Sequence, residues 1–311
     1  MANDFPTVAD SLADALDLSE AQVSDLEDAA PLVARLPAET SSNGTTHKYS
    51  KETAAPVVGF RAENVGRDFD HGADSIVTAT LTILDWSWAA DKAVADVWRK
   101  GGREAYIAMR GFRHVKAALK AYQDQLINGT GADSGGFNGF ADASTVDALA
   151  DRMVVDAGGT TADTASSFWA IRVGIDDVSA VVNGDETIAV GETTVQNFVD
   201  GSGGNLPIYY TPGTTWLGCQ VGSAFSLGRI VNLTEDSGKG LTDDLVYDLL
   251  SQFPTDRQPN LFLANRRSIK QLRNSRTATN GTGMPAPRPT EVDGIEILPV
   301  ESISETEALI S

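Results

Sequence analysis

Gln125-Leu126-Ile127-Asn128-Gly129-Thr130-Gly131 is followed two residues later by a glycine-rich turn, Ser134-Gly135-Gly136-Phe137-Asn138-Gly139-Phe140. The first stretch ends a long predicted helix over about 103–127. In this helix, apolar residues recur at intervals of four and three: Ala108, Phe112, Val115, Leu119, Tyr122 and Leu126. That spacing places them on one helix face, and a helix of this length extends about 37 Å. Asn128 and Gly129 are typical of a helix C-terminus.

An extended strand over 75–88 precedes this helix. Apolar residues that alternate with threonine predict the strand: Val77, Ala79, Leu81 and Ile83. The apolar face then switches to Leu84, Trp86 and Trp88. The switch predicts a bend or twist, with one half of the strand exposed and the other half entering a core. Residues 89–100 are predicted to be helical, and Gly101-Gly102 interrupts before the long helix begins.

Residues 37–84 predict an extended hairpin loop. Residues 37–74 are polar, with a cluster of Ser, Asn, Gly and Thr at 41–46. Arms of about 20–25 residues would reach roughly 70–80 Å. An isolated two-stranded hairpin is marginal in water, and the rest of the chain offers no obvious cover. The loop is therefore expected to lie on another molecule.

Residues 1–36 predict an acidic N-terminal arm. They hold eight acidic residues and one basic residue, Arg35. Val8, Leu12 and Leu16 recur every four residues, and Ser19 with Gln22 begins a second short helix that carries Val23 and Leu26. These thin amphipathic helices have little to bury against each other, so the arm is expected to need a partner surface.

The second half of the chain is rich in strands and then returns to α/β alternation. Alternating apolar residues predict strands near 169–175 and 217–227, and residues 183–205 are expected to be an exposed loop. A helix over about 245–253 stops at Pro254, and a buried strand over 261–263 leads into a basic helix over 266–276. A final strand covers 294–300. The fold class is α+β.

Composition excludes several classes of protein. The 311 residues hold 24 Lys and Arg against 43 Asp and Glu, a formal charge of −19, which argues against a free protein that clamps nucleic acid. Such charge favours solubility at high copy number. The lone cysteine, Cys219, fits a reducing compartment. We see no signal peptide and no apolar run long enough to span a membrane, and we expect a soluble cytosolic product.

The sequence contains no complete motif for catalysis, for a metal or for a cofactor. Gly129-Thr130-Gly131 begins like a dinucleotide fingerprint but follows a helix instead of a strand. The three histidines show no metal spacing, Ser226 lacks a nucleophile-elbow context, and Cys219 alternates into an apolar strand face. We therefore expect no catalytic residue, no cofactor and no metal.

Basic residues gather in two stretches. Residues 89–128 hold eight and residues 257–276 hold six, together 14 of the 24. One interpretation is a solvated helix face. The other is that these faces meet phosphates or acidic surfaces of neighbouring subunits, for which the N-terminal arm is an obvious candidate.

The order of these parts resembles the major capsid proteins of tailed bacteriophages. The end of the long helix, Gln125 to Gly131, is similar to the end of their spine helix, and the turn Gly136-Phe137-Asn138-Gly139-Phe140 follows it as in that family. Two C-terminal segments add to the resemblance: Pro259 to Leu272, and Gly294 to Val300 with the tail Ser302 to Glu307. The resemblance covers most of residues 30–311.

The resemblance implies a phage major capsid fold: an N-terminal arm (1–36), an extended loop or E-loop (37–84), a peripheral domain (85–235) with the spine helix and long strands, and an axial α/β domain (236–311). The spine-helix core is expected at Phe112, Val115, Leu119, Tyr122 and Leu126. Assembly contacts are expected at Lys48, Lys51, Arg61, Arg67, Trp86, Trp88, Arg110, Arg113, Arg266 and Arg267. In some relatives an E-loop lysine joins a neighbour's asparagine. Lys48 and Lys51 lie in that region, but no Asn or Glu matches by motif, so we expect no crosslink.

The implied function is a shell subunit that forms pentamers and hexamers of an icosahedral virion capsid around double-stranded DNA, assembled in the host bacterial cytoplasm. The DNA contact is expected to be non-specific, and no membrane is involved. Because the arm begins almost at Met1, a separate scaffolding protein is expected, beside a portal and a decoration protein. The alternatives are an encapsulin-type nanocompartment shell, a phage tail or decoration protein, and an enzyme.

Overall fold

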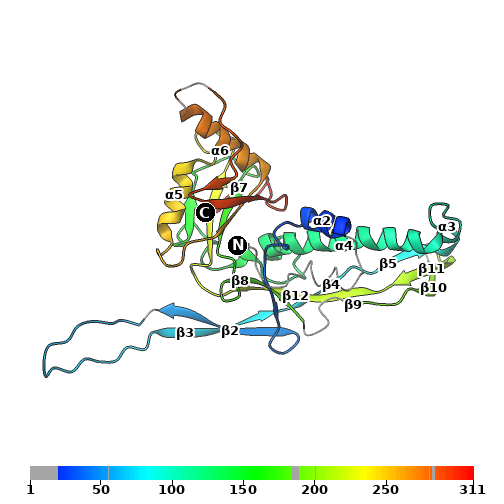
Figure 1. Ribbon diagram of the computed structural model, residues 1–311, viewed down its shortest axis with the longest axis horizontal. Coiled ribbons are helices and arrows are strands. Elements are labelled where there is room, and N and C mark those ends of the chain that lie inside the picture. Colours follow the sequence, from blue (N-terminus) through cyan, green and yellow to red (C-terminus); the bar gives the residue numbers. More distant parts are fainter. Residues whose placement is uncertain (1–19, 55, 184–188, 200, 280, 282–283) are drawn as a thin grey trace.

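The computed structural model describes residues 20–311 except 55, 184–188, 200, 280 and 282–283 (Figure 1). The first part of the predicted arm, with Val8, Leu12 and Leu16, lies outside the described residues. The helices are α2 (Glu20–Ala29), α3 (Lys92–Asp96), α4 (Gly102–Asn128), α5 (Asp243–Gln252) and α6 (Arg266–Thr279), with 3-10 turns η1 (Gly129–Gly131) and η2 (Phe140–Asp142). None of the helices in this described part is long and apolar enough to cross a membrane.

A six-stranded sheet with α5 and α6 forms a compact α/β unit, at the top of Figure 1. Its strands, in spatial order, are β15 (Glu291–Val292), β16 (Ile295–Pro299), β14 (Leu261–Ala264), β7 (Ser166–Ile171), β13 (Leu227–Leu233) and β6 (Val154–Asp156). Strands β7, β13 and β14 are buried on both faces, which explains their nearly continuous apolar sequences. Three of the strands precede residue 236 and three follow it, so this sheet crosses the predicted domain boundary at 235.

The spine helix α4 lies along two narrow sheets (Figure 1). One pairs β1 (Ala38–Thr40), β8 (Val178–Val182), β12 (Gly213–Val221) and β4 (Thr82–Asp85), with β9 (Ala189–Val190) on β12. The other pairs β10 (Thr194–Val199), β11 (Asn205–Thr211) and β5 (Trp88–Asp91). The buried Tyr122 hydroxyl donates to the Gly218 carbonyl at 3.0 Å and so ties the helix to β12.

The glycines after α4 explain why the helix stops so abruptly. Gly129 has φ of +53°, a conformation that L side chains rarely adopt, and its N–H donates to the Gln125 carbonyl. The Asp142 carboxylate accepts hydrogen bonds from the backbone of Thr130 and Gly139, both at 2.9 Å. A Cβ added at Gly129 would overlap that carboxylate. The predicted C-terminus of the spine helix is therefore correct to within a residue, and its ending is built by a turn that folds back on it.

The described part of the N-terminal arm does not extend away from the subunit. Helix α2 packs along α4, and Leu26 and the segment 30–36 bury apolar side chains in the same core. Lys116 on α4 pairs with Asp25 at 2.8 Å, and the Leu32 N–H donates to the Gln123 side chain at 3.0 Å. The prediction that these residues need a partner surface is corrected, because the chain's own spine helix provides it.

Two segments differ from their predicted structure. Residues 89–91 belong to β5 instead of a helix, because they pair with β11, and the short α3 follows. Residues 183–205 were expected to be a loop, yet β9, β10 and the start of β11 lie there. All six residues of β10 are exposed, so the strand lacks the alternating pattern by which a half-buried strand is detected.

The extended loop is a hairpin of β2 (Thr46–Ala54) and β3 (Ala73–Thr80), joined by an irregular segment over 56–72 that projects from the molecule (Figure 1). Its paired arms are shorter than the sequence suggested. The base of the hairpin contacts the body: His47 bonds to Gln220 at 2.7 Å, and the Tyr49 hydroxyl accepts from the Val221 N–H at 3.4 Å.

Candidate assembly surfaces

The projecting segment 56–72 carries apolar side chains in solvent. These side chains are more than half exposed: Val57, Val58, Phe60, Val65 and Phe69. Isolated exposed apolar residues are ordinary, but several on one projecting loop mark an interaction site. We call these five residues the loop-tip patch.

Polar contacts inside this segment hold the loop-tip patch in place. The Arg67 guanidinium donates to the carbonyls of Gly59 and Val57, at 3.0 and 2.7 Å. The Asp70 carboxylate accepts from the N–H groups of Val57 and Gly72, and these bonds lower its pKa. The two sides of the loop are therefore joined, so part of the ordering cost of docking is already met in the free subunit.

The predicted basic contacts on the loop fall into two groups. Arg67 is used within the loop, and Arg61 donates to the Val65 carbonyl at 3.3 Å. Lys48 is exposed on β2, whereas Lys51 is half-buried and its pKa is lowered by desolvation. All four residues lie on the hairpin loop, as the sequence predicts. The two arginines also stabilise the loop conformation, because they donate hydrogen bonds to its backbone carbonyls.

The spine helix presents the predicted core to the interior and basic residues to solvent. Val115, Leu119, Tyr122 and Leu126 are buried, while Phe112 is only partly buried against the same cluster. Arg110 and Arg113 are exposed. Arg110 donates to the Tyr106 hydroxyl at 3.1 Å and lies over its ring.

Trp86 and Trp88 are not surface residues, and their assignment to an interface is corrected. They are 5% and 7% exposed and stack on each other with ring centroids 5.9 Å apart. Gly213 lies against Trp86 and Gly111 against Trp88, so closely that an added Cβ would clash with either ring. These tryptophans fasten the spine helix to the sheet beneath it.

The two predicted arginines at the start of α6 behave differently. Arg267 donates to the backbone carbonyls of Glu305, Thr164 and Leu233, at 3.1, 2.8 and 3.2 Å, so it stabilises the fold of the subunit, and its interface role stays a prediction. Arg266 is exposed and pairs loosely with Glu301 at 3.4 Å. It therefore stays an interface candidate.

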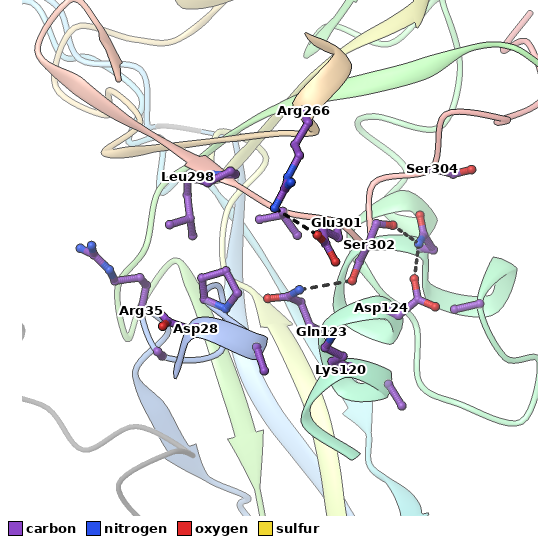
Figure 2. Close-up of a pocket in the computed structure, with 18 of the residues that line it drawn as sticks. Asp28, Arg35, Lys120, Gln123, Asp124, Arg266, Leu298, Glu301, Ser302 and Ser304 are labelled. Carbon is purple, nitrogen blue, oxygen red and sulfur yellow. Dashed lines mark hydrogen bonds and ion pairs between the residues drawn. The ribbon is translucent and has the colours of Figure 1, made fainter. Parts of the chain in front are cut away.

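A cavity of about 1590 Å³ opens between α2, α4 and the segment that follows β16 (Figure 2). Gln123 donates across it to the Ser302 hydroxyl at 3.3 Å. Its charged lining residues carry both signs and include Arg35, Lys120 and Arg266, and also Asp28, Asp124 and Glu301. This lining does not select one class of small ligand. Within the described ranges, moreover, no group of three or more His, Cys, Asp or Glu residues could hold a metal.

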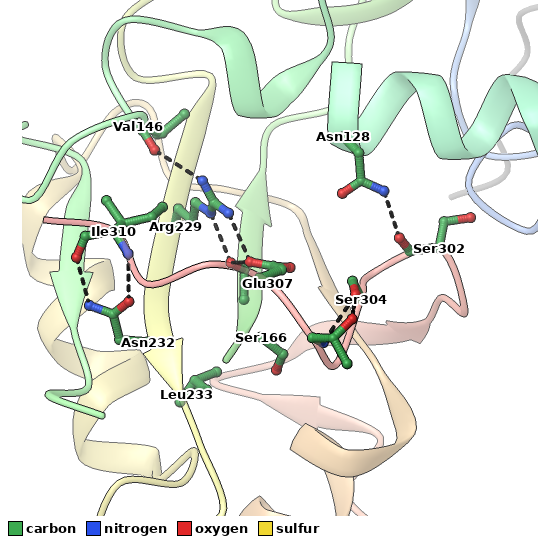
Figure 3. A network of polar contacts seen from close by, with 12 residues as sticks. Asn128, Val146, Ser166, Arg229, Asn232, Leu233, Ser302, Ser304, Glu307 and Ile310 are labelled. Atoms are coloured by element: carbon green, nitrogen blue, oxygen red, sulfur yellow. Dashed lines mark hydrogen bonds and ion pairs between the residues drawn. The ribbon is translucent and has the colours of Figure 1, made fainter. Parts of the chain in front are cut away.

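A polar network fastens the C-terminal segment across the α/β unit (Figure 3). Arg229 on β13 donates to Glu307 and to the Ser167 hydroxyl, both at 2.9 Å, and its guanidinium lies 4.7 Å from the Trp169 ring. Asn232 exchanges hydrogen bonds with the backbone of Ile310, at 2.9 and 3.1 Å. This network was not predicted from the sequence, although a lone arginine within the apolar strand 227–233 indicates a buried partner.

A second group of exposed apolar side chains lies at the end of the molecule where α3, β10 and β11 meet (Figure 1). Its side chains are 46–73% exposed: Val94, Val97, Val195, Phe198 and Val199. We call this the distal patch. The distal patch was not predicted from the sequence, because the composition of residues 183–205 is typical of an exposed loop.

These features define a class of protein. A long helix on narrow sheets, a projecting hairpin, a separate α/β unit and apolar patches left uncovered by the subunit together describe a subunit of a phage-type protein shell. A family model described as major capsid protein GP7 matches residues 18–311. The chain belongs to this family and is a structural subunit of a capsid shell, not an enzyme. A comparison with curated proteins finds no match.

Solved structures share the fold. The chain is similar to one in the near-atomic structure of bacteriophage Epsilon15, with a TM-score of 0.62 and 20% identity over 88% of this chain and 87% of that one. It is also similar to a chain of the bacteriophage JBD30 capsid, with a TM-score of 0.50 and 11% identity over 86% and 88%. A chain of the JBD30 capsid decorated with minor capsid protein trimers gives 0.51 and 12% over 87% and 89%.

The capsid resemblance drawn from the sequence is therefore confirmed, as is the α+β capsid fold. The family match favours a phage shell over the encapsulin alternative and over a tail or decoration protein.

Proposed function

We propose that copies of this chain assemble as pentamers and hexamers into a closed icosahedral shell that encloses double-stranded DNA, in the cytoplasm of a bacterial host. The observation that carries the proposal is the loop-tip patch. Its apolar side chains project from the subunit, and polar contacts at their base already order them. Such a loop gains stability by lying on a neighbouring copy.

The charge of the chain supports the same function. At −19 the free subunits repel one another until specific contacts form, which favours ordered assembly over aggregation. Individually weak contacts suffice, because each subunit makes many of them in a closed shell. A chain this acidic is not expected to bind packaged DNA tightly, so its proposed contact with DNA is weak and non-specific.

The partners follow from this function. Beside copies of itself, the chain is proposed to meet a separate scaffolding protein, a portal and a decoration protein. The proposed division into an arm (1–36), an extended loop (37–84), a peripheral domain (85–235) and an axial domain (236–311) assigns the loop to contacts between neighbours. It assigns the far end of the α/β unit to the centres of pentamers and hexamers. Because the six-stranded sheet crosses residue 235, the axial unit also takes strands β6, β7 and β13.

The test is negative-stain electron microscopy, with light scattering, of the protein expressed alone. Closed shells, or discrete pentamers and hexamers, support the proposal. A lumen filled with other proteins would favour the nanocompartment alternative. A monomer that assembles neither under crowding nor with added scaffolding protein would contradict shell formation.

A further inference from the structure

Strand β10 is an unusual edge. It pairs only with β11 among the residues that the structure describes, so its other side presents unpaired backbone groups. Its sequence, Thr194-Val195-Gln196-Asn197-Phe198-Val199, has no charge and no proline, and every side chain is exposed. Proteins blunt exposed edges with lysine, proline or a cover, since a bare edge recruits other strands. An edge that lacks these features is therefore expected to pair with another strand.

Pairing with β11 determines which backbone groups of β10 point toward the open edge. Asn197 lies opposite Pro207 of β11, and proline has no N–H to donate. Asn197 and Pro207 therefore form a pair that exchanges no backbone hydrogen bonds, and in an antiparallel ladder such pairs alternate with bonded ones. The backbone N–H and C=O of Asn197, and those of Val195 and Val199 two residues away, consequently face the open edge.

We infer that β10 of one subunit pairs antiparallel with β10 of a second copy, on a two-fold axis at Asn197. In this register Asn197 faces Asn197 of the second copy and exchanges backbone hydrogen bonds with it. Val195 faces Val199, so these apolar side chains meet across the seam, and Gln196 faces Phe198. The pairing rests on the proposed shell function, which brings copies of the chain together.

The absence of charge on β10 favours a second copy of this chain as the partner of the edge. The chain carries −19, so contacts between copies are opposed by repulsion unless the meeting surface is uncharged. β10 is such a surface. It is also self-complementary, as a two-fold interface requires, because the same strand supplies both halves. Backbone pairing of this kind is a common way to extend a sheet between proteins.

Cysteine crosslinking tests the register. Directly opposite residues of an antiparallel pair have Cα atoms about 5.5 Å apart, within the span of a disulfide. Asn197→Cys therefore places two thiols across the proposed axis. The natural thiol does not interfere, because Cys219 is buried and its pKa is raised to about 12. The matched control is Asn205→Cys, an exposed site at the start of β11, one strand inside the edge.

Both variants are purified under assembly conditions, oxidised mildly and run on a non-reducing gel, and the same samples are viewed by electron microscopy. We expect a reducible dimer for Asn197→Cys at a yield at least about tenfold above that of Asn205→Cys, because only the former meets disulfide geometry. Shells without this dimer, or equal dimer yields for both variants, would overturn the pairing and leave shell formation standing. A dimer without shells would support the pairing and count against the proposed function.

Discussion

At the scale of single residues, Arg229 shows how the C-terminal segment is held. Its side chain is 8% exposed and that of its partner Glu307 is 15% exposed. Burial lowers the pKa of Arg229, while the charge of Glu307 opposes this shift. A buried ion pair is not strong evidence of net stability, but loss of one partner leaves an uncompensated charge inside the protein.

Glu307→Gln is therefore expected to lower the free energy of unfolding by about 3 kcal/mol. The matched control is Glu301→Gln, which breaks a pair with Arg266 whose side chains are 83% and 73% exposed. Exposed pairs contribute roughly 0–1 kcal/mol, so this variant should unfold close to the parent. Urea denaturation of the unassembled subunit measures both. Equal losses in the two variants would contradict the role assigned to Arg229.

Cys219 gives a second prediction at this scale. Burial raises the pKa of its thiol from 9.0 to about 12, which lowers the reactive thiolate fraction near neutral pH about a thousandfold. The native subunit should be inert to a thiol reagent at pH 8, and the unfolded chain should react at once. Because the thiol ionises more readily in the unfolded chain, its contribution to stability is present below pH 9 and is lost as the pH rises further. Rapid labelling of the native subunit would contradict this placement.

At the scale of elements, the spine helix depends on a single apolar stripe. Leu119 is buried within it, and the neighbouring Ala117 is exposed. Leu119→Asp buries a charge without a partner and should prevent folding of the subunit. Ala117→Asp introduces the same side chain at an exposed position of the same helix. It should lower the free energy of unfolding by less than about 1 kcal/mol. Circular dichroism and solubility distinguish them, and a soluble helical Leu119→Asp subunit would contradict the position of the stripe. Phe112→Asp should be milder than Leu119→Asp, since Phe112 is only partly buried.

Elements with a strong local pattern were predictable, and elements defined by pairing were not. The spine helix follows from the spacing of its apolar residues, and its end follows from Asn128 and Gly129. Strands β5 and β10 have no such pattern. Both form through pairing with β11, which lies more than a hundred residues from β5 in the sequence, so a local reading does not detect them. Trp86 and Trp88 were placed on a surface for the same reason: only the folded chain brings Gly111 and Gly213 against them.

At the scale of the whole molecule, two groups of exposed apolar residues lie at opposite ends of the subunit (Figure 1). The loop-tip patch projects on the hairpin, and the distal patch lies at the far end of the spine helix, where α3, β10 and β11 meet (Figure 1). Surfaces that differ in this way fit different kinds of contact. A projecting loop suits a head-to-tail contact that repeats around a ring, whereas the bare edge of β10 suits a two-fold contact. A closed shell needs both kinds, since rings must also be joined to rings.

The loop contact can be tested separately from the edge. Phe60 and Phe69 are almost completely exposed, and burial of a phenylalanine contributes about 1.5–3 kcal/mol. The double variant Phe60→Ser with Phe69→Ser should fold normally, yet raise the concentration needed for assembly at least about tenfold. Glu63→Ser alters an exposed residue of the same loop without removing apolar surface, and should assemble at the parent concentration or below it. Light scattering against subunit concentration measures the threshold. Unchanged assembly of the double variant would show that neighbours do not bury the loop tip, and would move the main ring contact to another face of the subunit.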